Sequence, residues 1–244
     1  MTGESVATRK NTSHIWAVVP AAGVGSRMGL DKPKQYAELN GKAIIEHTLS
    51  RLNAHPLIEG VVVAISPEDT IWPSLCISLD KPLVVVDGGQ ERCHSVLNGL
   101  THLAGEISSQ DWVLVHDAAR PCLRLSDIDK LIQALNDHPV GGILACPVRD
   151  TMKRSNDNND VIGTVERANL WHALTPQMFR LGVLKTALLG ALDRGQIVTD
   201  EASAIEFNDL VPHLVEGSRD NIKITQHEDL SLAEYYLKKQ GQET

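Results

Sequence analysis

The sequence has few cysteines, no long apolar run and no HExxH pair of histidines. Its four cysteines are scattered, with no two at CxxC spacing and no His-Cys pattern of the zinc-finger type. No apolar run approaches the roughly 18 residues needed to span a bilayer. These absences argue against a zinc finger and a membrane protein. We therefore expect a reduced, cytoplasmic protein without a membrane segment.

An apolar segment is also missing from the first fourteen residues, Met1 to His14, so they do not resemble a secretory signal. We expect them to form a flexible N-terminal tail in front of a single domain over residues 15–244. Hydrophobic residues make up 42% of the chain and charged residues 22%, which is the ordinary balance of a globular protein with a substantial core.

The chain lacks an excess of positive charge. Its formal net charge is −8, and its isoelectric point is near 5.7. A nucleic-acid binder normally carries a basic domain or stripe, so no nucleic-acid partner is expected. The same negative field repels anionic substrates. A phosphorylated substrate would therefore require positive charge that is concentrated locally.

Short apolar runs alternate with longer segments that have helical spacing. The predicted strands are Ile15–Pro20, Gly60–Ile65, Leu83–Val86, Trp112–His116, Gly142–Pro147 and a strand near Ile222–Thr225. The predicted helices are Ala43–Asn53, Glu91–Leu103, Leu125–Asp137 (capped by Ser126), Phe179–Asp193 and Glu228–Lys239. Near-continuous apolar strands that alternate with helices indicate a mostly parallel sheet with both faces covered. The predicted fold class is therefore α/β, with a Rossmann-like arrangement.

One stretch, over residues 149–177, interrupts this alternation. Its centre, Ser155–Asp160, is polar and turn-forming, and the flanking Thr151–Arg154 and Val161–Arg167 are able to pair as a β-hairpin. A hairpin alone is only marginally stable in water. We therefore expect a protruding arm that packs on a second copy of the chain, the alternative being a mobile surface loop.

The most informative segment follows the first predicted strand and reads PAAGVGSRMGLDKPKQY. Its small residues allow backbone N–H groups to approach phosphate oxygens, and Arg27, Lys32 and Lys34 supply the local positive charge. A dinucleotide-binding loop needs GxGxxG, but Met28 stands at the third glycine, and the Walker A pattern is absent. The order Gly23, Gly25, Arg27, Pro33, Lys34 instead matches the GxGxR then Pro-Lys pattern of nucleotidyltransferases.

Several ordered motifs make the chain resemble the 2-C-methyl-D-erythritol 4-phosphate cytidylyltransferase family over nearly all residues from Trp16 to Leu237. They are PAAGVGSRM with PKQY, VVDGGQER with Ser95, VLVHDAARPC, CPVRDTMKR, LWHALTPQ, TDEASA and VEGSRDNIKIT. The resemblance implies a nucleotidyltransferase fold, CTP and 2-C-methyl-D-erythritol 4-phosphate as substrates, Mg²⁺ or another divalent cation as cofactor, and a homodimer joined through the arm.

The resemblance also implies roles for individual residues. Residues that match nucleotide-binding positions are Ala21, Ala22, Gly23, Gly25, Gly89, Ser95, Asp117 and Ala118. Residues that match catalytic positions are Arg27, Lys34 and Lys223, and those that match acceptor-binding positions are Arg120, Thr151, Arg167, Thr175 and Thr199. Asp117 is the candidate metal ligand, acting mainly beside the CTP phosphates. Arg167 would come from the arm of the partner subunit. Gln90 stands where family members often carry an acid, which leaves a base contact from its side chain open.

The residues alone leave other interpretations open. Asp117 directly follows a strand, as ligand-binding residues of open α/β sheets do, but it also suits a helix cap or an ion pair with Arg120. Arg167 and Lys223 also suit solvated surface charges. The histidines inside motifs, His94, His116 and His172, are expected to be structural. Rival functions are transfer to ribitol 5-phosphate or another sugar phosphate, nicotinamide-dependent oxidation and non-catalytic nucleotide sensing.

Overall fold

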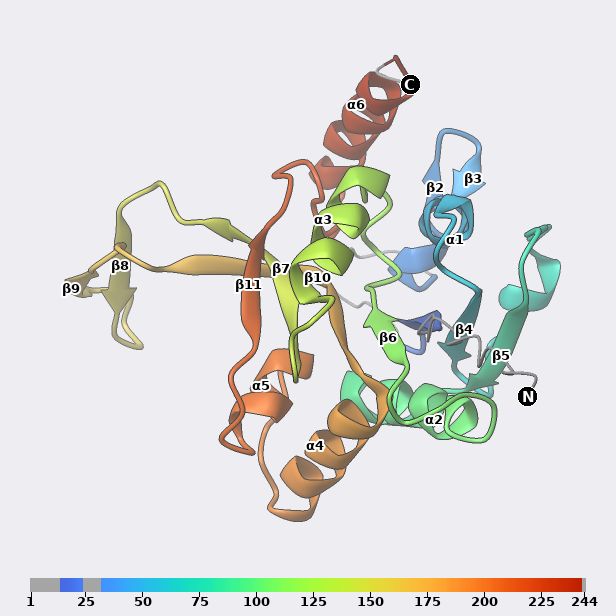
Figure 1. Ribbon diagram of the computed structural model, residues 1–244. Coiled ribbons are helices and arrows are strands. Elements are labelled where there is room, and N and C mark those ends of the chain that lie inside the picture. The colour runs from blue at the N-terminus through green and yellow to red at the C-terminus, as the bar shows by residue number, and fades with distance from the viewer. Residues whose placement is uncertain (1–13, 24–31, 243–244) are drawn as a thin grey trace, which may run out of the picture.

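Alternating strands and helices build one seven-stranded sheet with helices on both faces (Figure 1). The computed structural model describes residues 14–23 and 32–242. The predicted tail lies outside these residues except for His14, whose backbone N–H donates to Asp111 Oδ1 at 3.1 Å. Gly25 and Arg27 also lie outside the described residues. Within the described ranges, no helix is long and apolar enough to cross a membrane.

The predicted mostly parallel sheet is confirmed. In spatial order its strands are β11 (His213–Glu216), β7 (Gly141–Pro147), β10 (Trp171–Arg180), β6 (Trp112–Val115), β1 (Ile15–Pro20), β4 (Gly60–Ile65) and β5 (Leu83–Asp87). The two pairs that involve β10 are antiparallel, and the other neighbours are parallel. Two short hairpins, β2 (Glu38–Leu39) with β3 (Lys42–Ala43) and β8 (Met152–Ser155) with β9 (Val161–Val165), lie outside this sheet.

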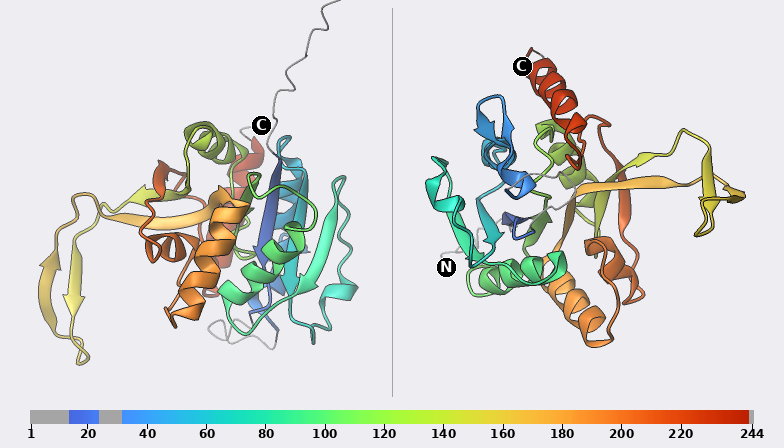
Figure 2. Two further views of the ribbon diagram at one scale, coloured as in Figure 1. Left: turned by 60° about the horizontal axis from the view of Figure 1, so that its bottom comes forward. Right: turned by 180° about the vertical axis from the view of Figure 1, so that it is seen from behind.

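Helices cover both faces because successive strand side chains point to opposite sides. On β1, Ala17 and Val19 face one core and Val18 faces the other. Helices α1 (Ile44–Ala54) and α3 (Leu125–Leu135) cover the first face, and α2 (Arg92–Leu103), α4 (Leu181–Asp193) and α5 (Glu201–Glu206) cover the second. Figure 2 shows both layers, and α6 (Glu228–Gln242) packs at the end of the molecule that carries α1 and α3.

Two local predictions were wrong. Helix α3 begins at Leu125 after Arg124, so Ser126 lies inside the first turn and does not cap it. Residues Ile222–Thr225 form no strand, although they are extended: the N–H of Ile224 donates to the carbonyl of Ala119 at 2.9 Å, and no sheet ladder forms there. The alternation of apolar and polar residues in this segment comes from packing against a loop and α6 rather than from a sheet.

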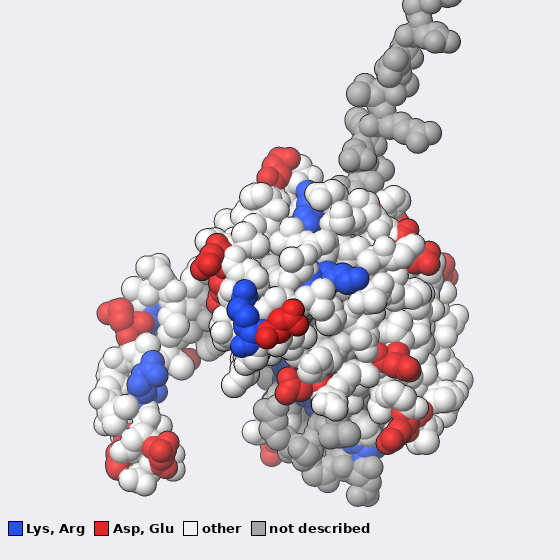
Figure 3. Space-filling view, turned by 90° about the horizontal axis from the view of Figure 1, so that it is seen from below, with Lys and Arg blue, Asp and Glu red and all other residues white. Residues whose placement is uncertain are grey.

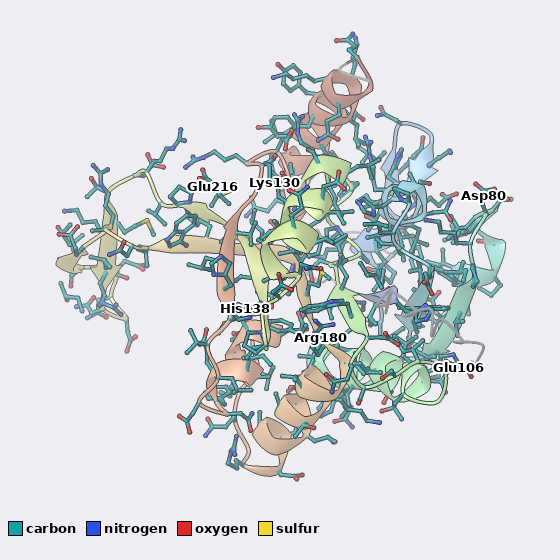
Figure 4. The ribbon with its side chains drawn as sticks, viewed as in Figure 1. Asp80, Glu106, Lys130, His138, Arg180 and Glu216 are labelled. Carbon is teal, nitrogen blue, oxygen red and sulfur yellow. The ribbon has the colours of Figure 1, made fainter. Side chains whose placement is uncertain are left out.

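The hairpin of the arm is present, with β8 and β9 close to the predicted strands. Strand β10 was not predicted, and it extends past the end of the predicted arm because it runs into the central sheet, where it pairs with β7 and β6. Figures 1 and 2 show the hairpin standing away from the body of the subunit. At the other end of β10, the Arg180 guanidinium lies 3.7 Å from the centre of the Trp112 ring, a cation–π contact at the position labelled in Figure 4.

Candidate active site

Two adjoining pockets open at the carboxyl ends of the parallel strands. The first pocket is lined by residues that follow β1, β5 and β6, and the second by residues of β10 and of the segment before α5. Arg92, Asp117 and Lys223 line both pockets. This edge of an open α/β sheet is where ligands generally bind, so the two pockets are the candidate site.

The pockets gather most of the site residues predicted from the sequence. The first pocket is lined by the predicted residues Ala21, Ala22, Gly23, Lys34, Gly89, Ser95, Asp117, Ala118 and Lys223, and by Gln90. The second pocket is lined by the predicted residues Arg120, Thr175 and Thr199, together with Asp117 and Lys223. Thr151 and Arg167 line neither pocket, and Arg167 instead donates a hydrogen bond to the carbonyl of Arg149 within the arm.

Gln35 anchors the start of the glycine-rich loop, a role that the sequence did not reveal. Its side-chain Nε2 donates to the carbonyl of Ala21 at 2.6 Å and to that of Gly23 at 3.2 Å. The side chain is 4% exposed. Because both carbonyls point at Gln35, the turn is held from behind while Gly23 stays exposed. The sequence feature that could have indicated this role is the position of Gln35 in the PKQY motif, directly after Lys34.

The turn after β5 needs glycine because other parts of the chain approach it closely. A Cβ on Gly88 would lie 2.2 Å from the Cβ of Ala22, and a Cβ on Gly89 would lie 2.2 Å from the Cβ of His94. The N–H of Gly89 donates to Ser95 Oγ at 3.0 Å, which ties the turn to the first turn of α2. The turn after β5 therefore packs against both the glycine-rich loop and α2.

Three cations surround the carboxylate of Asp117. Arg92 Nε donates to its Oδ1 at 3.0 Å, while Lys223 Nζ and Arg120 Nε approach its Oδ2 at 2.9 and 3.5 Å. Burial opposes ionisation, but the charges of Arg92, Lys223 and Arg120 outweigh it and hold the pKa of the Asp117 carboxyl below its usual range. The ion pair with Arg120, one of the open interpretations, is therefore present, together with two further cations.

The backbone of Asp117 is held by a chain of hydrogen bonds through His116. The Asp117 N–H donates to Thr175 Oγ1 at 3.1 Å, and this hydroxyl lies 3.0 Å from His116 Nδ1. The other ring nitrogen, Nε2, lies 3.0 Å from the carbonyl of Arg120. Because a carbonyl only accepts, Nε2 carries the proton, and Nδ1 accepts from the Thr175 hydroxyl. His116 thus serves as a neutral, structural residue, as expected.

The burial of His116 predicts a loss of stability in acid. Burial lowers its pKa from 6.5 to about 4, so between these values the unfolded chain binds the proton and the folded chain does not. The free energy of unfolding therefore falls as the pH falls from 6.5 towards 4, by about 3 kcal/mol from this group. Urea unfolding at a series of pH values should show a smaller fall over this interval in His116→Gln, which does not titrate there. Equal slopes for the variant and the wild type would contradict the prediction.

An ion pair between Arg92 and Glu201 connects the two pockets to α5. Arg92 Nη1 and Nη2 lie 2.6 and 3.0 Å from the two carboxylate oxygens of Glu201, and the Glu201 side chain is 1% exposed. Asp200 caps α5 by accepting from the N–H of Ser203 at 3.0 Å. Sequence reasoning did not single out Arg92 or Glu201. The signal that was available was their place inside the VVDGGQER and TDEASA motifs.

A divalent cation bound together with a polyphosphate is compatible with this arrangement. Among the described residues that line the first pocket, Glu91 and Asp117 carry carboxylates. Mg²⁺ usually takes one or two protein carboxylates and completes its shell with water and substrate phosphates. Asp117 is fully ionised but already paired with cations, so a metal would need to take most of its ligands from the phosphates.

The chain is similar to known cytidylyltransferases over nearly its whole length. A family model described as 2-C-methyl-D-erythritol 4-phosphate cytidylyltransferase matches residues 15–239. The protein of that name from Vibrio parahaemolyticus is 56% identical, with 94% of this chain and 97% of the relative covered. The one from Pseudomonas putida is 54% identical, with 88% and 92% covered.

The chain is also similar to solved structures of such cytidylyltransferases. The crystal structure of the Francisella tularensis 2-C-methyl-D-erythritol 4-phosphate cytidylyltransferase is 40% identical, has a TM-score of 0.79, and covers 92% of this chain and 100% of its own. A crystal structure of 4-diphosphocytidyl-2C-methyl-D-erythritol synthase is 36% identical, with a TM-score of 0.81 and coverage of 92% and 99%. Together with the pockets at the carboxyl edge of the sheet, these similarities show that the chain belongs to the 2-C-methyl-D-erythritol 4-phosphate cytidylyltransferase family.

Proposed function

We propose that this chain transfers CMP from CTP to 2-C-methyl-D-erythritol 4-phosphate and releases pyrophosphate, a step of non-mevalonate isoprenoid biosynthesis. The observation that carries the proposal is that two pockets meet at Arg92, Asp117 and Lys223. A nucleotide in the first pocket and a phosphorylated acceptor in the second would therefore lie side by side, with cations between them.

The first pocket is suited to CTP. Small residues at its base, Ala21 to Gly23, leave the backbone open to phosphate oxygens, and the same role is assigned to Gly25. The turn at Gly89, tied to Ser95, is assigned to the cytosine base. Asp117 and Ala118 are assigned to the ribose side. Lys34 and Arg27 are assigned to the phosphates.

The second pocket is suited to the phosphorylated acceptor. Its lining includes three cations, Arg92, Arg120 and Lys223, and the hydroxyl groups of Thr175 and Thr199, beside the carboxylates of Asp117 and Asp200. Arg120 Nη1 donates to the carbonyl of Asn221 at 2.7 Å, which fixes the guanidinium at the wall of the pocket. Cations held in place in this way favour a phosphate monoester without reorganising as it binds.

The chemistry needs charge neutralisation more than proton transfer. An oxygen of the acceptor phosphate attacks the α-phosphorus of CTP, a new P–O bond forms, and the bond to pyrophosphate breaks. The second pKa of a phosphate monoester is about 6, so the nucleophile is already ionised at neutral pH and no general base is required. Lys34 and Arg27 are proposed to stabilise the charge on the five-coordinate phosphorus, and Lys223 to orient the acceptor. Bound Mg²⁺ would neutralise the triphosphate and the departing pyrophosphate, with Asp117 as the residue proposed to hold it.

Pyrophosphate release tests the proposal. The purified chain is incubated with Mg²⁺ and CTP, with and without 2-C-methyl-D-erythritol 4-phosphate, and UTP, ATP and ribitol 5-phosphate serve as controls. Release that requires both CTP and methylerythritol phosphate supports the proposal. Release with another nucleotide or acceptor would support nucleotidyl transfer but contradict the proposed substrates. Binding of CTP without any release would favour a nucleotide-sensing role.

We further propose that the active form is a homodimer in which the arm of one subunit supplies Thr151 and Arg167 to the second pocket of its partner. In support, the hairpin exposes Val161 by 63% and Ile162 by 61% in the single chain. Apolar side chains on a hairpin that stands away from its own subunit need a covering surface.

The free thiols of all four cysteines support the further proposal that the protein has a cytoplasmic location.

Mixing two inactive variants is expected to restore activity if the arm acts on the partner. In a mixed dimer of Lys34→Ala and Arg167→Ala chains, one site combines intact Lys34 with intact Arg167, and the other site lacks both. In an equal mixture about half of the dimers are mixed, so about a quarter of wild-type activity should return after co-refolding. Each variant alone serves as the control. No recovery, with mixed dimers shown by mass spectrometry, would place Arg167 in its own subunit or outside the site.

A further inference from the structure

A cluster of three metal-ligating side chains lies at the first turn of α2, next to the first pocket. One ligand atom each from Glu91, Cys93 and His94 lies within 4.8 Å of the other two. Neighbouring ligand atoms in a tetrahedral zinc site are roughly 3.3 to 3.8 Å apart, given bond lengths of about 2.0 to 2.3 Å. Small side-chain rotations would therefore bring the three atoms to coordination distance.

One contact brings two of these side chains together, and the third has a buried nitrogen without a partner. The buried Cys93 thiol donates to Glu91 Oε2 at 3.7 Å, so the sulfur and the carboxylate already face each other. His94 Nδ1 is buried and has no hydrogen-bond partner among the described residues. A buried polar atom without a partner is uncommon in native proteins, and a bound ion would satisfy it.

We propose that Glu91, Cys93 and His94 form a binding site for a transition-metal ion of the zinc class, with one coordination position left to solvent. The donors are a thiolate, an imidazole and a carboxylate, a set that suits Zn²⁺ or Co²⁺ and not Mg²⁺. When the ion binds, Cys93 loses its thiol proton to solvent and the sulfur becomes the ligand. The site differs from the proposed Mg²⁺ position in its donors and in its residues.

The site lies against the turn after β5. His94 packs directly beneath Gly89, where an added Cβ would lie 2.2 Å from the Cβ of His94. Glu91 lines the first pocket, and its side chain is exposed. An ion on these three ligands would therefore share one residue, Glu91, with the lining of the first pocket.

Titration of the full chain with Co²⁺, without Mg²⁺ or nucleotide, tests the site. We expect one Co²⁺ per chain, with a sulfur-to-cobalt charge-transfer band in the near ultraviolet and the visible bands of tetrahedral cobalt, both removed by Zn²⁺. Cys93→Ala should abolish the charge-transfer band. His94→Ala and Glu91→Gln should weaken Co²⁺ binding by at least roughly tenfold, since the loss of even an outer-shell partner costs 10- to 100-fold.

Cys76→Ala is the matched control, because Cys76 is a free and exposed cysteine outside the cluster. It should leave the band unchanged. Absence of the band in the wild type, its survival in Cys93→Ala or its loss in Cys76→Ala would overturn the proposal. Circular dichroism checks that each variant is folded. If Cys93→Ala fails to fold, Glu91→Gln still tests the proposal, because Glu91 is exposed and its replacement should not disturb folding. Unchanged Co²⁺ affinity in a folded Glu91→Gln would also overturn the proposal.

Discussion

Replacing Lys34 by alanine is expected to lower kcat by about a hundredfold or more. The side chain lines the first pocket, where its charge is proposed to stabilise the phosphorus centre under attack. The loss of one such preorganised donor costs about 3 kcal/mol or more in comparable sites. Steady-state kinetics with both substrates would measure the effect, and kcat should fall more than KM rises, because the interaction strengthens in the transition state.

Lys42→Ala is a matched control for this experiment. Lys42 lies on β3, is exposed and lines neither pocket, so its removal changes the net charge equally without touching the site. Lys34 Nζ also donates to the carbonyl of Ile224 at 3.2 Å. Thermal unfolding should therefore accompany the kinetics, to separate loss of charge from loosening of the segment that carries Lys223. Near-normal turnover in a folded Lys34→Ala would reject the catalytic assignment.

Replacing Arg92 by methionine is expected to lower the free energy of unfolding by about 3 to 5 kcal/mol. The substitution leaves the Glu201 carboxylate, which is 1% exposed, without its bidentate partner. Removing one member of a buried ion pair carries a cost of this size because the remaining charge stays desolvated. Guanidinium unfolding at pH 7 would measure the change.

The double variant Arg92→Met/Glu201→Leu should recover much of this loss, because neither charge then remains buried alone. Glu201→Gln is the milder single variant, since an amide oxygen still accepts from Arg92. Arg92 also contacts Asp117 Oδ1, so both Arg92 variants should lose activity even where stability returns. Glu201→Leu alone completes the comparison, and a double variant as unstable as the sum of Arg92→Met and Glu201→Leu would contradict the ion-pair explanation.

Much of the site was predictable because its residues follow strands whose apolar character is plain. Asp117 comes two residues after β6, and the small residues Ala21 to Gly23 come directly after β1. Parallel strands bring their carboxyl ends to one edge of a sheet. Two residues distant in sequence, such as Gly89 and Ala118, therefore meet at one pocket.

The parts that were not predicted depend on partners far along the chain. In the sequence, Glu201 resembles an ordinary acidic residue of a short helix. Its burial is explained by the ion pair with Arg92, which lies 109 residues away along the chain. Strand β10 was not predicted because Trp171–Leu174 are exposed or half-buried while Thr175–Phe179 are buried, although the whole strand belongs to the central sheet, so it has no uniform pattern. The Ile222–Thr225 segment showed strand-like alternation, but among residues 14–23 and 32–242 no strand pairs with it to form a ladder.

The acidic and basic side chains are interspersed on the face seen in Figure 3, and this also holds for the arm. On this face, positive charge is therefore not gathered into a continuous basic surface. In the candidate site, by contrast, individual cations are held in place by a specific contact: Arg92, Arg120 and Lys223 all surround the carboxylate of Asp117.

Strand β10 limits how the arm is able to change in evolution. Its ten residues, Trp171–Arg180, begin at the base of the arm and pass Thr175, whose hydroxyl accepts from the Asp117 N–H. An insertion within this strand would shift Thr175 by at least one residue and turn alternate side chains to the opposite face. Changes in arm length are therefore expected at the far turn around residues 156–160, which is exposed, while the length of β10 should stay fixed.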